Sequence, residues 1–171
     1  MSTVLSREDI NKLVKQEPPL VENYLDLEAQ VQPNGFDMTV RDIAMPQTMG
    51  RITVSNKNRQ ISDAAPLTFD TFGAMELMPG IYIITYNEIV NLPTNVIALA
   101  RPRSSLLRCG VTVETAVWDA GYSGRSQSLM VVYNQRGFRI EKNARVTQLV
   151  FMQLTDTTEG YNGTYQGENI T

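Results

Sequence analysis

Short β-rich runs fill the sequence beyond Pro18 and Pro19, and they constrain the fold more than any other feature. Turn-forming Gly, Pro, Asn and Asp residues separate these runs. The predicted strands are residues 37–43, 50–54, 66–69, 80–86, 96–101, 111–117, 128–133, 139–140 and 145–154. Many short strands favour a barrel or a sandwich over alternating βα units. We therefore predict an all-β domain, folded as a distorted β-barrel or jelly roll.

The N-terminal segment, residues 1–20, has a helical pattern instead. Ser6 and Asp9 form a capping-box pattern, and apolar residues follow at helical spacing. We expect one short helix here. A chain of 171 residues is of the usual size for one domain, so residues 1–171 are predicted to form a single domain.

The C-terminal tail, residues 155–171, has few aliphatic residues and is rich in Thr, Gly and Asn. We expect this tail to be mobile. It also contains Tyr161 and Tyr165, which leaves two interpretations open. The tail is either plain disorder or a lid that orders over a ligand through an aromatic contact.

The absence of histidine excludes several kinds of catalysis. The chain has no histidine, and Cys109 is its single cysteine. It cannot form the His/Cys/Cys or three-Cys site of a zinc-dependent base deaminase, nor a Ser-His-Asp or Cys-His catalytic group. Catalysis must therefore use carboxylates, arginines, hydroxyls, amides, main-chain donors or a metal held mainly by oxygen.

Charge and hydropathy exclude two kinds of partner. A formal net charge of −3 does not provide the basic surface that binds a nucleic-acid backbone. The sequence has no apolar stretch of membrane-spanning length, and its first residues lack the basic and apolar regions of a signal peptide. We expect a cytoplasmic protein that binds neither nucleic acid nor membrane.

Arg103, Ser104 and Ser105 directly follow a predicted strand. A guanidinium and two hydroxyls in consecutive positions can hold a phosphate group. Pro102 fixes the turn before them by restricting its predecessor to extended geometry. The alternative is an ordinary strand-to-loop transition with a surface arginine and capping serines.

Residues 117–124 form a second candidate segment, in which Asp119 is followed by the glycine-flanked Tyr122. A carboxylate beside bound phosphates can act as a general base for an attacking water, and a tyrosine ring can pack against a sugar. A hairpin loop with a solvated aspartate is the other interpretation.

Separated segments of the chain resemble the superfamily of dUTPases and dCTP deaminases, in that family's usual order. They are Pro-Asn-Gly-Phe-Asp-Met at 33–38, Arg-Pro-Arg-Ser-Ser-Leu at 101–106, Val-Trp-Asp-Ala-Gly-Tyr-Ser-Gly at 117–124 and Ala-Arg-Val-Thr-Gln-Leu-Val at 144–150. The resemblance implies a dUTPase-like β-barrel, a homotrimer with active sites shared between subunits, a deoxynucleoside triphosphate substrate and Mg²⁺ as cofactor.

The resemblance also implies roles for individual residues. Asp119 would activate the water, and Tyr122 would pack on the deoxyribose. The remaining substrate-binding residues are Arg103, Ser104, Ser105, Arg108, Gln148, Tyr165 and Gln166. Arg145 would hold the site together. Asp37 would support it, either through water near Mg²⁺ or as a buried hydrogen-bonding residue. No protein residue is expected to bind Mg²⁺ directly, because substrate phosphates and water would hold it.

The choice between hydrolysis and deamination depends on a missing carboxylate. Related deaminases use a glutamate at the position of Val131, and no Asp or Glu occurs from Ala120 through Ile140. We therefore predict a dUTP diphosphatase that forms dUMP and pyrophosphate. A dCTP deaminase or a bifunctional, dUMP-forming deaminase is the alternative, and Glu114 keeps an unusual deaminase open. A non-catalytic deoxynucleotide-binding regulator is less favoured, since Asp119 and the phosphate ligands are present.

Overall fold

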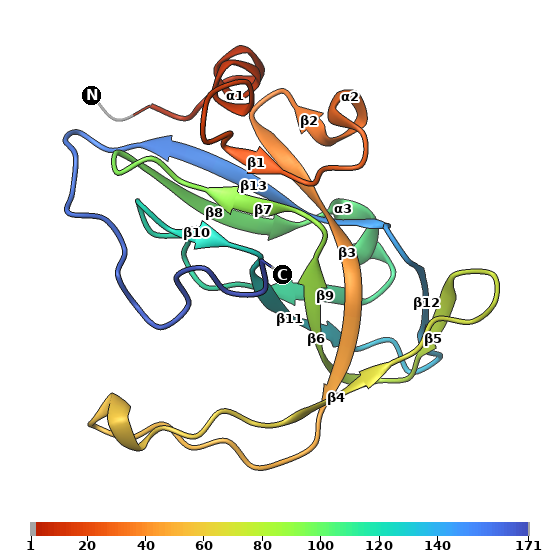
Figure 1. Ribbon diagram of the computed structural model, residues 1–171. Helices are drawn as coiled ribbons and strands as arrows, with labels where there is room; N and C mark the ends of the chain where they lie inside the picture. The colour runs from red at the N-terminus through yellow and green to blue at the C-terminus, as the bar shows by residue number, and fades with distance from the viewer. Residues whose placement is uncertain (1–2, 171) are drawn as a thin grey trace.

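The computed structural model describes residues 3–170, which fold around a barrel-like antiparallel sheet (Figure 1). The strand order is β8 (Val96–Pro102), β13 (Arg145–Gln153), β3 (Gly35–Pro46), β6 (Gly80–Tyr86), β11 (Gln127–Val132) and β9 (Val111–Glu114). The outermost strands of this order, β8 and β9, contact each other, so the barrel is nearly closed. The predicted all-β barrel is confirmed.

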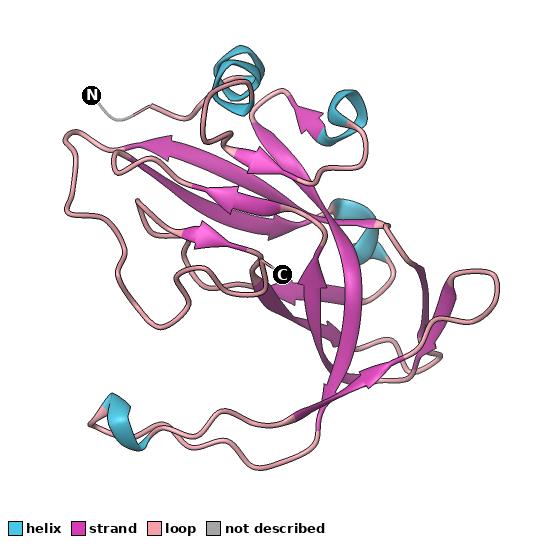
Figure 2. Ribbon diagram, viewed as in Figure 1, coloured by secondary structure: helices cyan, strands magenta, loops and turns pink. Residues whose placement is uncertain are grey.

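Shorter elements surround the barrel (Figure 2). β2 (Val31–Gln32) and β4 (Ala64–Leu67) pair with β3. One small sheet has the order β1 (Val21–Glu22), β7 (Ile89–Asn91) and β10 (Ser123–Gly124), and another joins β5 (Ala74–Leu77) to β12 (Phe138–Glu141). The helical elements are α1 (Arg7–Val14), α2 (Leu27–Gln30), η1 (Asn56–Asn58) and α3 (Ser104–Arg108).

The barrel forms because its strands alternate buried and outward residues. In β11, Ser128, Met130 and Val132 are buried, whereas the residues between them face outward. A period of two gives each strand one inner face, and a shift by one residue would expose it. The inner faces meet in one core that includes the fully buried Phe36 and Phe151.

The predicted N-terminal helix is confirmed as α1, and its capping box is formed. Ser6 Oγ accepts a hydrogen bond from the Asp9 backbone N–H, and the Asp9 carboxylate accepts one from the Ser6 N–H. Ile10 and Val14 turn inward. No helix within residues 3–170 is long and apolar enough to cross a membrane.

The predicted strand at residues 50–54 is wrong. Residues 47–63 instead form a long excursion between β3 and β4, which we call the arm (Figure 1). Its only strand-like pairing is a bridge from Arg51 to Gln60. Met49, Ile52 and Val54 are 85%, 78% and 111% exposed. No other element of residues 3–170 covers these β-prone side chains, so residues 50–54 do not form a strand of a sheet.

Candidate active site

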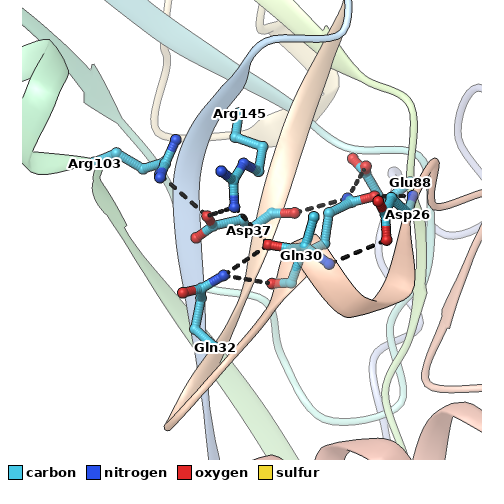
Figure 3. Close-up of polar contacts among 8 residues, drawn as sticks. Asp26, Gln30, Gln32, Asp37, Glu88, Arg103 and Arg145 are labelled. Atoms are coloured by element: carbon cyan, nitrogen blue, oxygen red, sulfur yellow. Dashed lines mark hydrogen bonds and ion pairs between the residues drawn. The ribbon is translucent and has the colours of Figure 1, made fainter.

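A buried carboxylate organises the residues predicted to bind phosphate (Figure 3). Asp37 on β3 is 2% exposed, and its Oδ2 lies 3.1 Å from Arg103 Nε and 3.3 Å from Arg145 Nη1. Burial raises the pKa of Asp37, while the two guanidiniums act to lower it. Because about a third of each arginine side chain is exposed, the guanidiniums are held in place and still accessible to a ligand.

Strand register places the other predicted phosphate ligands beside this carboxylate. Gln148 on β13 lies opposite both Asp37 on β3 and Arg101 on β8. The Arg103 N–H donates to Val146 O at 3.0 Å, and the exposed Ser104 and Ser105 begin α3 directly afterwards. These residues therefore gather at one end of the β8–β13 ladder. Arg108 is exposed in the last turn of the same helix.

A hydrogen-bond network behind Asp37 holds β3 in position. Gln30 Nε2 donates to the Asp37 carbonyl at 2.9 Å and to Glu88 Oε1 at 2.7 Å (Figure 3). Glu88 Oε2 accepts from the Thr39 N–H at 2.9 Å. Burial raises the pKa of Glu88, and these hydrogen bonds oppose that rise. No local sequence pattern marks Gln30 and Glu88 as functional residues, because their contact joins distant segments.

A second group of predicted residues surrounds a cavity of about 410 Å³. Asp119 and Tyr122 line it together with the buried Trp118, whose Nε1 donates to Ser126 Oγ at 3.0 Å. Asp119 is exposed, whereas Tyr122 is buried. The volume is in the range of small-molecule sites. The arrangement gives a solvent-accessible carboxylate next to an aromatic wall.

The C-terminal tail lies against this cavity. Gln166 Oε1 accepts from the Ser123 N–H at 3.0 Å, and Gln166 Nε2 donates to Gly121 O at 3.0 Å. Tyr165 lines the cavity as well. The structure thus brings both predicted tail residues to the Asp119 loop. Whether the tail moves stays a prediction.

Glu168 is a cavity residue that no sequence pattern predicts. The Tyr122 hydroxyl donates to Glu168 Oε1 at 2.9 Å. Burial raises the pKa of Glu168, and the tyrosine hydrogen bond acts to lower it. Burial, followed by the Glu168 charge, also raises the pKa of Tyr122. The signal was hidden because Glu168 lies in a Gly- and Asn-rich tail, far in sequence from the tyrosine.

Within the chain the two groups of residues are separate. Trp118 pairs with Ala98 on β8, and Arg103 lies five residues farther along the same chain segment. At 3.3 Å per extended residue, roughly 16 Å separates Ala98 from Arg103. The described residues that line the Asp119 cavity include neither Arg103 nor Gln148. A single chain therefore does not place its own Asp119 beside its own phosphate ligands.

Comparison with known proteins identifies the family. Residues 4–154 match the family model described as dCTP deaminase-like. The chain belongs to this family. It is 52% identical over 167 residues to a protein of Methanosarcina mazei named probable deoxyuridine 5′-triphosphate nucleotidohydrolase, covering 97% of this chain and 98% of that one. The family resemblance predicted from the sequence is confirmed.

A second archaeal relative and a solved structure are also similar to this chain. An Archaeoglobus fulgidus protein with the same name is 46% identical over 167 residues, covering 98% of both chains. The crystal structure of a 2′-deoxycytidine 5′-triphosphate deaminase from Agrobacterium tumefaciens superposes with a TM-score of 0.66 at 21% identity. That match covers 89% of this chain and 48% of the deaminase. At 21% identity, this similarity shows a shared fold.

Proposed function

We propose that this protein is a dUTP diphosphatase, which hydrolyses dUTP to dUMP and pyrophosphate. The observation that carries the proposal is the exposed Asp119 carboxylate beside Tyr122 in the cavity. Val131, at the position where related deaminases use a glutamate, also supports the proposal. It lies between Ile81 and Thr112 in the sheet and has no acid–base group. The names of the archaeal relatives, including the one from M. mazei, agree with this activity.

The proposed reaction is an in-line attack of water on the α-phosphorus. Asp119 accepts the proton of the water as the new P–O bond forms. The bond from the α-phosphorus to the bridging oxygen breaks, and pyrophosphate leaves. The Arg103 guanidinium, the adjacent serine hydroxyls, Arg108 and the Gln148 amide stabilise the charge on the phosphate oxygens. Tyr122 packs on the deoxyribose.

The donors of the site fit Mg²⁺ that arrives with the substrate. Among residues 3–170, no group of three or more His, Cys, Asp or Glu side chains is placed to hold a metal. Mg²⁺ commonly binds through one or two carboxylates, substrate phosphates and water. Asp37 is engaged by two arginines and Asp119 is assigned to the water, so substrate phosphates and water would hold the ion. Bound Mg²⁺ would neutralise charge on the phosphates.

We further infer that three copies of the chain complete the active sites. Apolar side chains are exposed on several elements, among them Ile81 on β6, Leu99 on β8 and Val117 after β9, which are 51%, 42% and 52% exposed. Contacts between identical subunits would bury such side chains. They would also bring Asp119 of one subunit to Arg103 of another. Such a shared site is needed because Asp119 and Arg103 lie apart within one chain. Location in the cytoplasm stays a prediction.

Mixing inactive subunits tests the shared site. Arg103→Ala and Asp119→Asn proteins should each be nearly inactive alone. If a site uses Arg103 from one subunit and Asp119 from its neighbour, random trimers from an equal mixture should recover about one quarter of the wild-type sites. The control mixes wild-type chains with the double variant. Mixed trimers without recovered activity would show that each site belongs to one chain.

Glu168 provides the observation that favours a second candidate, a dCTP deaminase or a bifunctional deaminase. Residues 120–140 contain no Asp or Glu that could act as the deaminating acid–base group. Glu168 lies outside that range and lines the cavity from the tail. A carboxyl group at the cavity wall whose pKa is raised by burial can take part in proton transfer.

Incubation with dUTP or dCTP in the presence of Mg²⁺ separates the candidates, when pyrophosphate and ammonia are measured independently. The hydrolase releases pyrophosphate from dUTP and no ammonia from dCTP. Ammonia from dCTP would overturn the assignment, and no product from either nucleotide would favour a binding protein.

A further inference from the structure

The arm reaches the cavity that we assign to the nucleotide. Ile61 of the arm lines this cavity together with Tyr165 of the tail. Arg59, two residues earlier, places its guanidinium carbon 5.5 Å from the centroid of the Tyr165 ring. Segments more than 100 residues apart in the sequence thus meet at one wall of the cavity.

We propose that Arg59 is a positioning residue, which holds the Tyr165 ring at the nucleotide cavity so that arm and tail close it together. The inference rests on the proposed function for the identity of the nucleotide. Arg59 has no salt-bridge partner within residues 3–170, so its charge is free to interact with the ring. A guanidinium within about 6 Å of an aromatic centroid is attracted to its face.

Tyr165, whose ring Arg59 contacts, is linked through its backbone to the predicted sugar-binding residue. The Tyr165 N–H donates to the Tyr161 hydroxyl at 3.3 Å. The Tyr161 ring in turn packs edge-on against Tyr122, with 5.9 Å between centroids. Fixing Tyr165 therefore helps to set the whole aromatic wall of the cavity. The arm thereby gains a role that its sequence, read as a strand, did not suggest.

Arg59 should affect how the nucleotide is positioned and not the rate of the chemical step. It does not line the cavity, and Asp119 lies on a different segment. Loss of the Arg59 side chain should weaken nucleotide binding and leave the chemical step unchanged. An exposed cation–π contact corresponds to about a 2- to 5-fold change in an equilibrium constant.

Hydrogen exchange without nucleotide tests the contact itself. In Arg59→Ala, the backbone amides of residues 161–168 should exchange about 2- to 5-fold faster than in the wild type. Arg59→Lys, which keeps a cation, should retain part of the protection. Lys57→Ala is the matched control, because Lys57 is an exposed cation on the same arm. Equal exchange in Arg59→Ala and Lys57→Ala would overturn the proposal.

Kinetics test whether the nucleotide uses this contact. Arg59→Ala should raise the KM for dUTP about 2- to 5-fold, with kcat changed less than twofold. Adding Arg59→Ala to Tyr165→Ala should cause no further loss, because the pair acts as a unit. Additive effects would overturn the role of Arg59. A wild-type protein that releases no pyrophosphate would refute the hydrolase assignment instead, and dissociation constants for dUTP and dCTP would then replace KM.

Discussion

Glu88→Gln removes one oxygen acceptor from the network behind the phosphate ligands. Glu88 Oε1 faces Gln30 Nε2 at 2.7 Å, and Glu88 Oε2 faces the Thr39 N–H at 2.9 Å. A glutamine has only one side-chain oxygen. Whichever way its amide is turned, an NH₂ group points at a buried donor. The variant leaves that donor without an acceptor.

The cost follows from that unsatisfied donor. A buried polar group without a partner costs about 1–3 kcal/mol, so the free energy of unfolding should fall by that amount. Glu22→Gln is the matched control. Glu22 is partly buried, and its side chain accepts one hydrogen bond, from Asn91 Nδ2 at 2.6 Å. A glutamine keeps that acceptor, so the control should change stability by less than about 0.5 kcal/mol.

The pH dependence has a definite sign. Burial raises the pKa of Glu88 in the folded protein above its ordinary value of 4.5. At a pH between 4.5 and the folded-state pKa, Glu88 keeps its proton in the folded protein and has lost it in the unfolded chain. The stabilising contribution of Glu88 is therefore complete below pH 4.5 and declines as the pH rises through the folded-state pKa. The advantage of the wild type over Glu88→Gln should narrow over the same interval.

Urea unfolding at fixed protein concentration, from pH 4.5 to 8, measures both quantities. A fixed concentration is needed because the proposed assembly of subunits would contribute to stability. If Glu88→Gln is as stable as Glu22→Gln at pH 4.5, the network does not hold the fold in the way described. A wild-type advantage that widens with increasing pH would contradict the direction of the pKa shift.

Variants at three further residues test the two groups of the site. Gly121→Ala puts a Cβ 2.7 Å from a tail Cα at a residue with φ of +80°, so limited proteolysis should cleave the tail faster than in the wild type. Arg103→Lys loses the planar donor that Asp37 orients, and steady-state kinetics should show a KM for dUTP raised about tenfold or more. Glu168→Gln keeps an acceptor for the tyrosine hydroxyl, so tail hydrogen exchange should match the wild type, whereas Glu168→Ala should exchange faster.

The sequence predicted those parts of the fold that depend on local pattern. The strand at residues 80–86 has the predicted bounds, and the Ser6 and Asp9 capping box forms as expected. A local pattern with no buried face misled at residues 50–54, where apolar side chains lie on the exposed arm. Periodicity identifies a strand only when another element covers one of its faces.

The candidate site divides in the same way. Arg103 and Asp119 lie in contiguous motifs, so sequence alone could single them out. Glu168 lines the cavity from the tail, and Arg59 contacts the ring of Tyr165, which lines it; both depend on contacts between distant segments. Neither residue type predicts such a contact from the sequence, because arginines and glutamates are common on any protein surface.

Turnover of dUTP by Asp119→Asn, measured together with its affinity for dUTP, tests the central claim most directly. The asparagine keeps the shape of the side chain and cannot accept the proton of the water. Pyrophosphate release should fall about 10²- to 10⁴-fold, while the dissociation constant for dUTP, measured by calorimetry, stays within a few-fold of the wild type. Turnover close to the wild-type rate would show that Asp119 does not activate the water.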